Sequence, residues 1–350
     1  MRKLLPLALA MLIAMGLVGC QSARTYQCEG AATDIRQAKE PGRAVENMEE
    51  YIAGDGKDQP CAYVMLFWGY GELGNFPQAI IYRDKALELD PAVSAEIDDI
   101  IVENRFFVKA RDAAITAIQG EDFELALGNS LVAQELEPEH YIAYYLAGEC
   151  FRILDDMENA ADQYSLAIAK LHDLESVGRF TMPEEGQAKR VYYRGCATLS
   201  DAEQYDKAWE AIELAMDKFP EFTEVEMVRA RLLVKEERND EAEEAYLALI
   251  PRVEAVYNEA ADEAAKETAR HQYANLLSDV GVYYIQRNDL ASEDLLLAVG
   301  YLQQAYELDP ESESVIRNLY LVYNQLGFTA GDDPKIAAVY DAYKRISGSY

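Results

Sequence analysis

The chain has 350 residues, of which 63 are acidic and 32 are lysine or arginine, so its formal net charge is −31. So strong a negative charge repels phosphate backbones and anionic lipid surfaces, which disfavours binding of nucleic acid. Half of the residues are apolar, and there are only 11 prolines and 20 glycines. This composition favours an all-helical fold over one with many strands.

Residues 1–19 have the layout of a secretory signal peptide. Two basic residues precede an apolar run that ends at Val18 and is too short to cross a bilayer comfortably. The stretch LVGC, which ends at Cys20, resembles the lipobox of bacterial lipoproteins. The resemblance implies cleavage before Cys20, a lipid on that residue, and anchoring of the mature chain by acyl chains. The alternative is an ordinary signal peptide with a chance cysteine.

A lipidated Cys20 implies a place in the bacterial cell envelope. Gln21 follows it where enterobacterial inner-membrane lipoproteins carry Asp, which favours the outer membrane, facing the periplasm. No other membrane segment is expected later in the chain. Export also places the remaining cysteines in an oxidising compartment.

Residues 20–59 are expected to form an N-terminal tether with a short helix around Arg43–Tyr51 and a polar loop, GDGKDQP. Cys28 and Cys61 bracket this segment, so a disulfide between them would pin it to the chain that follows. With Cys150 and Cys196 the four cysteines allow three pairings. Free buried thiols are the alternative.

The stretch VMLFWGYGELGNFPQA (64–79) contains Gly69, Gly71 and Gly74 in the spacing G-x-G-x-x-G. This spacing fits either a phosphate-binding loop between a strand and a helix or a turn between two helices. A dinucleotide fold needs a strand and an acidic residue about twenty residues further on. The chain instead continues as KALELDP, which is typical of a helix end. The sequence therefore favours a helical turn at Gly74, with Pro77 at the start of the second helix.

Four segments end alike, with ALELDP (86–91), AQELEP (133–138), AMDKFP (215–220) and AYELDP (305–310). Before each lie two helical patterns separated by a polar turn, with small and aromatic residues at recurring positions. This arrangement resembles the tetratricopeptide repeat (TPR), a helix–turn–helix unit of about 34 residues. The resemblance covers most of residues 60–345. It implies an all-α, right-handed superhelical solenoid of about six to seven repeats.

The segment 141–174 matches the TPR pattern best, with Gly148, Ala160 and Tyr164 among its matching residues. Small residues let two helices approach closely, and aromatic residues fill the space around those contacts. One helical pair cannot bury its apolar stripe alone, so neighbouring pairs stack. In such a stack Cys150 and Cys196 would lie on neighbouring first helices, which permits a second disulfide.

Insertions are expected near residues 93–106, 175–188 and 251–273. The first is expected to lengthen the helix that follows, the second to form a loop, and the third to form one long helix.

No catalytic or metal-binding motif is evident. His140, His172 and His271 lack the spacing of metal ligands and are expected at the surface or at helix ends. The sequence therefore predicts a protein that is not an enzyme and that needs no metal or cofactor.

A TPR array implies a binding groove lined by its first helices, which in this family holds a segment of a protein partner. The expected groove residues are mainly basic and aromatic: Trp68, Arg111, Ile115, Tyr145, Arg152, Arg190, Tyr193, Met227, Arg231, Lys235, Val282, Ile285 and Arg317. Fewer acids are expected there: Glu72, Glu149, Asp201 and Glu224. Arginines in the groove suit carboxylates of a partner, unless local acids already pair with them.

These features predict a lipid-anchored TPR scaffold that binds a protein or peptide partner during envelope assembly, pilus biogenesis or export. The alternative is a transport-associated TPR lipoprotein whose helices enclose a cavity for a small molecule. An open groove favours the scaffold, and a continuous internal pore or pocket favours the alternative.

Overall fold

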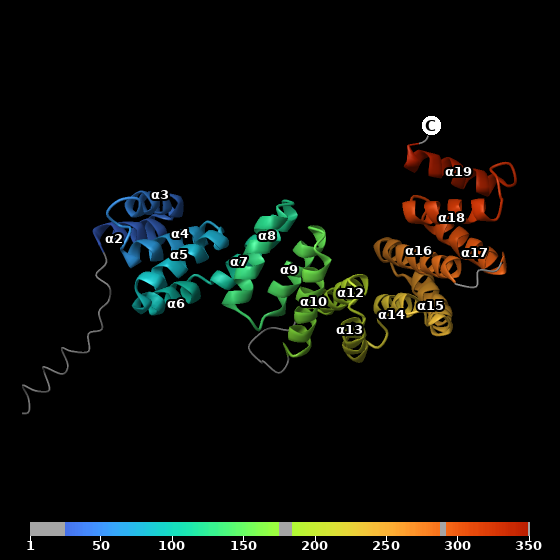
Figure 1. Ribbon diagram of the computed structural model, residues 1–350, viewed down its shortest axis with the longest axis horizontal. Helices are drawn as coiled ribbons and strands as arrows, with labels where there is room; N and C mark the ends of the chain where they lie inside the picture. The colour runs from blue at the N-terminus through green and yellow to red at the C-terminus, as the bar shows by residue number, and fades with distance from the viewer. Residues whose placement is uncertain (1–24, 175–183, 288–291, 349–350) are drawn as a thin grey trace, which may run out of the picture. The chain divides into compact units, whose positions relative to one another are not determined.

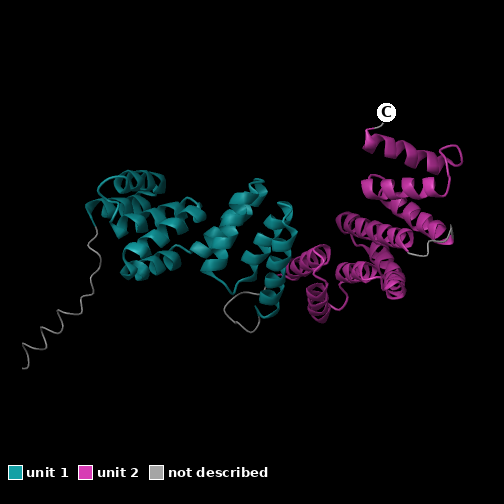
Figure 2. Ribbon diagram, in the orientation of Figure 1, with its two compact units in different colours: residues 1–182 teal, residues 183–350 magenta. Residues whose placement is uncertain are grey.

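A computed structural model describes residues 25–174, 184–287 and 292–348 of the chain. Within these ranges every regular element is a helix and no strand occurs. The chain divides into two compact units, residues 1–182 and 183–350, each with its own hydrophobic core (Figure 1, Figure 2). The predicted all-α fold of helix–turn–helix repeats is confirmed. Residues 1–19, expected to be a signal peptide, and Cys20 lie outside the described residues.

The first unit begins with two short helices and continues as three helical hairpins. Its helices are α2 (Tyr26–Thr33), the π-helical turn η1 (Asp34–Ala38), α3 (Pro41–Ile52), α4 (Pro60–Glu72), α5 (Phe76–Leu89), the 3-10 turn η2 (Pro91–Val93), α6 (Ser94–Glu103), α7 (Phe106–Gln119), α8 (Phe123–Leu136), α9 (Tyr141–Ile153) and α10 (Met157–His172). The hairpins are α4–α5, α7–α8 and α9–α10.

The second unit consists of four helical hairpins. Its helices are α12 (Glu185–Asp201), α13 (Tyr205–Lys218), α14 (Thr223–Lys235), α15 (Asn239–Glu259), α16 (Glu263–Gln286), α17 (Ser292–Leu308), α18 (Glu313–Gln325) and α19 (Pro334–Ser347). Consecutive helices pair, and the first helix of each hairpin also contacts the first helix of the next, as α12, α14, α16 and α18 do in turn. The hairpins of this unit therefore stack as a repeat protein requires.

Glycines and alanines allow the two helices of a hairpin to lie close together. A Cβ atom on Gly148 would lie 3.1 Å from the ring of Tyr164, which is fully buried. A Cβ on Gly281 would lie only 2.5 Å from Cγ of Leu302 on the facing helix. Contacts between carbon atoms are optimal at about 3.5–4.0 Å, so these sites accept no side chain without movement of a neighbour. Gly148 thus lies against an aromatic ring, as expected for small residues of the repeat pattern.

The stretch at 64–79 contains a turn between two helices, as the sequence favours. Gly69 and Gly71 lie inside α4, where a Cβ would collide with Val45 and with Phe106, respectively. Gly74 lies after the helix at φ +78°, a left-handed conformation that suits glycine. Each of the three glycines thus has a role in packing or in the turn.

The turn inside a hairpin has the same geometry in six of the seven hairpins; the seventh turn lies outside the described residues. A left-handed residue follows the first helix each time: Gly74, Glu121, Asp155, Glu203, Glu237 and Gly327. The next residue donates its backbone N–H to a carbonyl five residues earlier, at 2.8–3.0 Å. This is the Schellman motif, which satisfies carbonyls at the end of a helix.

The N-terminal segment covers the first hairpin. A disulfide joins Cys28 of α2 to Cys61 of α4, with Cα atoms 6.1 Å apart. The guanidinium of Arg36 lies 4.8 Å from the centroid of the Trp68 ring, and Trp68 is 2% exposed. The helices α2 and η1 therefore add a layer that the sequence pattern did not predict, because only a helix around Arg43–Tyr51 stood out.

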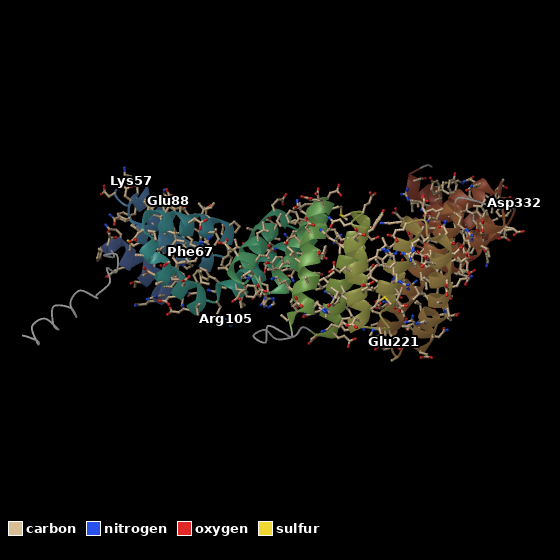
Figure 3. The ribbon with its side chains drawn as sticks, turned by 60° about the horizontal axis from the view of Figure 1, so that its bottom comes forward. Lys57, Phe67, Glu88, Arg105, Glu221 and Asp332 are labelled. Atoms are coloured by element: carbon tan, nitrogen blue, oxygen red, sulfur yellow. A yellow bond between two sulfur atoms is a disulfide. The ribbon has the colours of Figure 1, made fainter. Side chains whose placement is uncertain are left out.

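All three insertions differ from the predicted form, at least in part. Residues 94–103 form the separate helix α6, because Arg105 adopts a left-handed conformation (φ 53°) before α7 (Figure 3). The 251–273 segment is not one long helix: α15 ends at Glu259, and α16 begins after Asp262, whose side chain accepts a hydrogen bond from the N–H of Ala265. The insertion thus lengthens two helices of successive hairpins. Residues 184–188, expected in a loop, belong to the start of α12 from Glu185 on.

Buried aromatic and aliphatic side chains hold each unit together. Phe67, labelled in Figure 3, is 1% exposed and contacts Phe106 edge-on, with ring centroids 5.3 Å apart. No helix among the described residues is long and apolar enough to span a bilayer.

Candidate functional site

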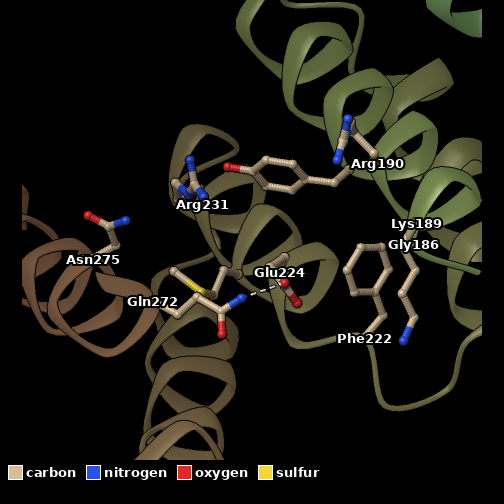
Figure 4. A pocket seen from close by; sticks show the side chains of 10 residues that line it. Gly186, Lys189, Arg190, Phe222, Glu224, Arg231, Gln272 and Asn275 are labelled. Carbon is tan, nitrogen blue, oxygen red and sulfur yellow. Dashed lines mark hydrogen bonds between the residues drawn. The ribbon is translucent and has the colours of Figure 1, made fainter. Parts of the chain in front are cut away.

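A pocket of about 420 Å³ lies in the second unit, where the first helices of three successive hairpins meet (Figure 4). Helix α12 contributes Gly186, Lys189, Arg190 and Tyr193. Phe222 precedes α14, which contributes Glu224, Met227 and Arg231, and α16 contributes Gln272 and Asn275. Since α14 contacts both α12 and α16, it forms the middle of the pocket.

The α12 side of the pocket is cationic. Lys189 pairs with Glu185 at 2.6 Å, and its Nζ also lies 5.5 Å from the ring centroid of Phe222. Arg190 is exposed and forms no ion pair with any described residue. A guanidinium presents several N–H donors in one plane, so Arg190 is available for a carboxylate.

Arg231 is already paired within the protein. Its Nε lies 3.2 Å from Oδ2 of Asp279 on α16, although the two atoms are not aligned for a hydrogen bond. Burial raises the pKa of Asp279 to about 6, and the charge of Arg231 opposes part of that rise. The Asp279 side chain is 26% exposed, whereas that of Arg231 is 39% exposed. Arg231 can therefore meet a ligand on one side while Asp279 contacts it on the other.

The α16 side of the pocket carries amides. Gln272 donates to Oε1 of Glu224 at 2.6 Å, as Figure 4 shows, and Thr223 donates to the other carboxylate oxygen at 3.1 Å. Asn275 is exposed. Met227 and Phe222 are 5% and 4% exposed and form an apolar floor. The pocket thus offers a cation, amides and an apolar surface within a short distance.

Five residues that the sequence places in the groove come together in this pocket: Arg190, Tyr193, Glu224, Met227 and Arg231. Other predicted groove residues in the unit lie outside it. Lys235 donates to the carbonyl of Ser200 and to Asp201, at 2.9 and 2.8 Å, and Arg317 pairs with Glu313. Val282 and Ile285 are half-buried and do not line the pocket.

In the first unit the predicted arginines and aromatic residues of the groove have partners inside the protein. Trp68 is a correction: it is buried beneath Arg36, because the N-terminal helices cover that face. Arg111 pairs with its neighbour Asp112, and Arg152 pairs with Glu149. Tyr145 contacts Tyr164 edge-on. Local acids therefore pair with these arginines, as the alternative reading of the sequence expects.

The sequence did not indicate five pocket residues: Gly186, Lys189, Phe222, Gln272 and Asn275. Phe222 precedes α14, so a search of helix interiors misses it. Gln272 lies on α16 within the expected insertion 251–273, and Asn275 lies on the same helix just after it. The helical spacing of the buried Ala269, Tyr273 and Leu276 was the available signal.

The remaining candidate residues do not form a chemical site. Cys150 and Cys196 are buried free thiols, so the second disulfide does not form. Burial raises their pKa values, to about 11 for Cys150 and about 12 for Cys196. Burial likewise lowers the pKa of His140 to about 4. The described residues contain no group of three or more potential metal ligands.

No protein-family model matches the chain, and no curated protein matches it in sequence. Several solved structures match it at low similarity. YrrB, described as a TPR protein with an unusual peptide-binding site, is 20% identical over 62% of this chain and 94% of its own, with a TM-score of 0.40. PilF of Pseudomonas aeruginosa is 15% identical over 70% and 95%, with a TM-score of 0.43. The Cut9–Hcn1 structure is 12% identical over 98% and 57%, with a TM-score of 0.48.

Proposed function

We propose that this protein is a lipid-anchored scaffold of a bacterial envelope, and that it binds a segment of a protein partner in the pocket between α12, α14 and α16. The observation that carries the binding role is the exposed Arg190, which forms no ion pair with a described residue and lies in a pocket that three first helices build. Envelope location rests on the resemblance of residues 1–20 to a lipoprotein signal.

The pocket is open, which favours an extended ligand such as a peptide over a small molecule that is enclosed by the protein. Gly186, Arg190 and Asn275, from the two outer helices, are all exposed, so the pocket opens to solvent. Its volume of about 420 Å³ suits a few side chains of a peptide. The same volume also lies within the range of about 300–1,000 Å³ that is typical of small-molecule sites. A small solute is therefore the second candidate.

Site-specific photo-crosslinking in cells that make the protein tests the scaffold role. A photoreactive residue replaces Tyr193 or Asn275 in the pocket, and Arg345 on α19 serves as an exposed control position. We expect a protein adduct from the two pocket positions that the control does not give. The adduct should disappear when Arg190→Glu is added. The same set of adducts at all three positions would contradict a specific groove.

A further inference from the structure

We propose that the pocket recognises a carboxylate of an acidic peptide segment, with Arg190 as the primary contact and Arg231 as the second. This inference rests on the proposed function and specifies the chemistry of the partner. We base it on a comparison of the charged residues that line the pocket, according to whether each already has an oppositely charged partner within the protein.

Most charges that line the pocket are already neutralised within the protein. Lys189 has Glu185, and Arg231 has Asp279. Glu224 accepts hydrogen bonds from Gln272 and from its neighbouring threonine. Arg190 forms no ion pair with a described residue, so the uncommitted charge of the pocket is positive.

The different side chains on α12 and α16 also determine which part of the ligand binds at each side of the pocket. Arg190 lies on α12, so a carboxylate would bind there and would avoid Glu224 on α14. Asn275 on α16 has an exposed amide, which can both donate to and accept from the backbone of an extended peptide. Methylene or aromatic groups of the ligand, between its carboxylate at Arg190 and its backbone at Asn275, would cover Met227 and Phe222. A guanidinium beside an apolar floor is a typical anchor of an interface.

The guanidinium of Arg231 already contacts one carboxylate, that of Asp279. The groups around Asp279 are Arg231 on α14 and Tyr246 on α15, and Arg231 in turn faces Tyr193 on α12. Because the Nε contact is not aligned for a hydrogen bond, the guanidinium keeps donor capacity for a ligand. Arg231 can therefore contact Asp279 and a carboxylate of the ligand at the same time.

Binding of degenerate peptide pools to the full-length protein tests the inference. One pool of fluorescent twelve-residue peptides has Glu fixed at a central position, and the matched pool has Gln there. Each is made with a free and with an amidated C-terminus, and succinate serves as a small dicarboxylate competitor. We expect the Glu pool to bind about tenfold or more tightly than the Gln pool, as a charge-assisted contact provides. Arg190→Gln should abolish this preference, whereas Arg345→Gln should leave it.

The outcomes separate the two proposals. Equal binding of the Glu and Gln pools, with no effect of the C-terminal charge, overturns the carboxylate inference but leaves a peptide groove. Preference only for a free C-terminus supports the carboxylate and locates it at the chain end. Binding of succinate without either pool, lost in Arg190→Gln, supports the carboxylate while contradicting the peptide scaffold. Failure of every probe to bind contradicts both.

Discussion

Two glycine-to-alanine changes in one hairpin provide a sharp test of how the repeats pack. Gly281 lies in α16 and Gly300 in α17, both inside helices. A Cβ on Gly281 would lie 2.5 Å from Cγ of the buried Leu302 and 3.3 Å from the carbonyl oxygen of Ala298. A Cβ on Gly300 meets nothing within 4 Å. The two sites therefore share the chemical change but not the surroundings.

The expected difference follows from this geometry. Gly-to-Ala inside a helix gains about 1 kcal/mol in helix propensity at both sites. The entropy that alanine removes from the unfolded chain is also common to both variants. Overpacking at Gly281 costs about 1–3 kcal/mol, because Leu302 or the α17 backbone must move. We therefore expect Gly281→Ala to be less stable than Gly300→Ala by about 1–3 kcal/mol.

Hydrogen exchange measured by mass spectrometry on peptides from α16 and α17 reports the stability of this hairpin locally. The predicted difference corresponds to exchange that is roughly 5- to 150-fold faster in Gly281→Ala than in Gly300→Ala. Urea unfolding followed by circular dichroism serves as the global comparison. Equal protection in both variants, or greater protection in Gly281→Ala, would refute the close approach of the two helices.

Three further predictions concern charge, the disulfide and the lipid. The pKa of Asp279 is raised to about 6 in the folded protein, so the contribution of this residue to stability grows as the pH falls through 6. Asp279→Asn should raise the free energy of unfolding at pH 7.5 by up to about 3 kcal/mol and should flatten the dependence of that free energy on pH between 4 and 7. Urea midpoints of the variant that match those of the unchanged protein across that range would count against this prediction. The same variant should bind the Glu pool more tightly at pH 7, because Arg231 loses its internal partner. The Cys28–Cys61 disulfide closes a loop with a sequence separation of 33. Replacing both residues by serine should therefore lower the free energy of unfolding, measured by urea titration, by roughly 3–4 kcal/mol. An unchanged urea midpoint would contradict this prediction. Cys20→Ser should move the protein from the membrane fraction to the soluble fraction and abolish labelling by a palmitate analogue; retention at the membrane would contradict the lipid anchor.

The fold was predictable because its information is local and recurs. Small residues such as Gly148 and Ala160 recur at fixed distances from aromatic residues, so several weak signals support one another along the chain. The turn at Gly74 was likewise predictable, since its glycine and the following Asn75 are typical of a helix end and a helix cap.

The binding surface was only partly predictable, because it depends on contacts between residues far apart in the sequence. Arg190 and Arg111 look alike as residues of first helices, yet Arg111 pairs with Asp112, whereas Arg190 has no such partner in the part of the chain that the structure describes. Trp68 has the position of a groove residue, but Arg36 from the N-terminal segment covers it. No periodic pattern marks such a covering segment, because it belongs to no repeat.

The left-handed residue in the six described hairpin turns offers a route to a more stable protein. At four turns it is an acid, namely Glu121, Asp155, Glu203 and Glu237. A side chain in this conformation costs roughly 1–2 kcal/mol, and a negative charge is also disfavoured at the C-terminal end of a helix. Glycine carries neither penalty and already stands at Gly74 and Gly327. An engineer could therefore raise heat resistance turn by turn while leaving the ligand-facing surface untouched.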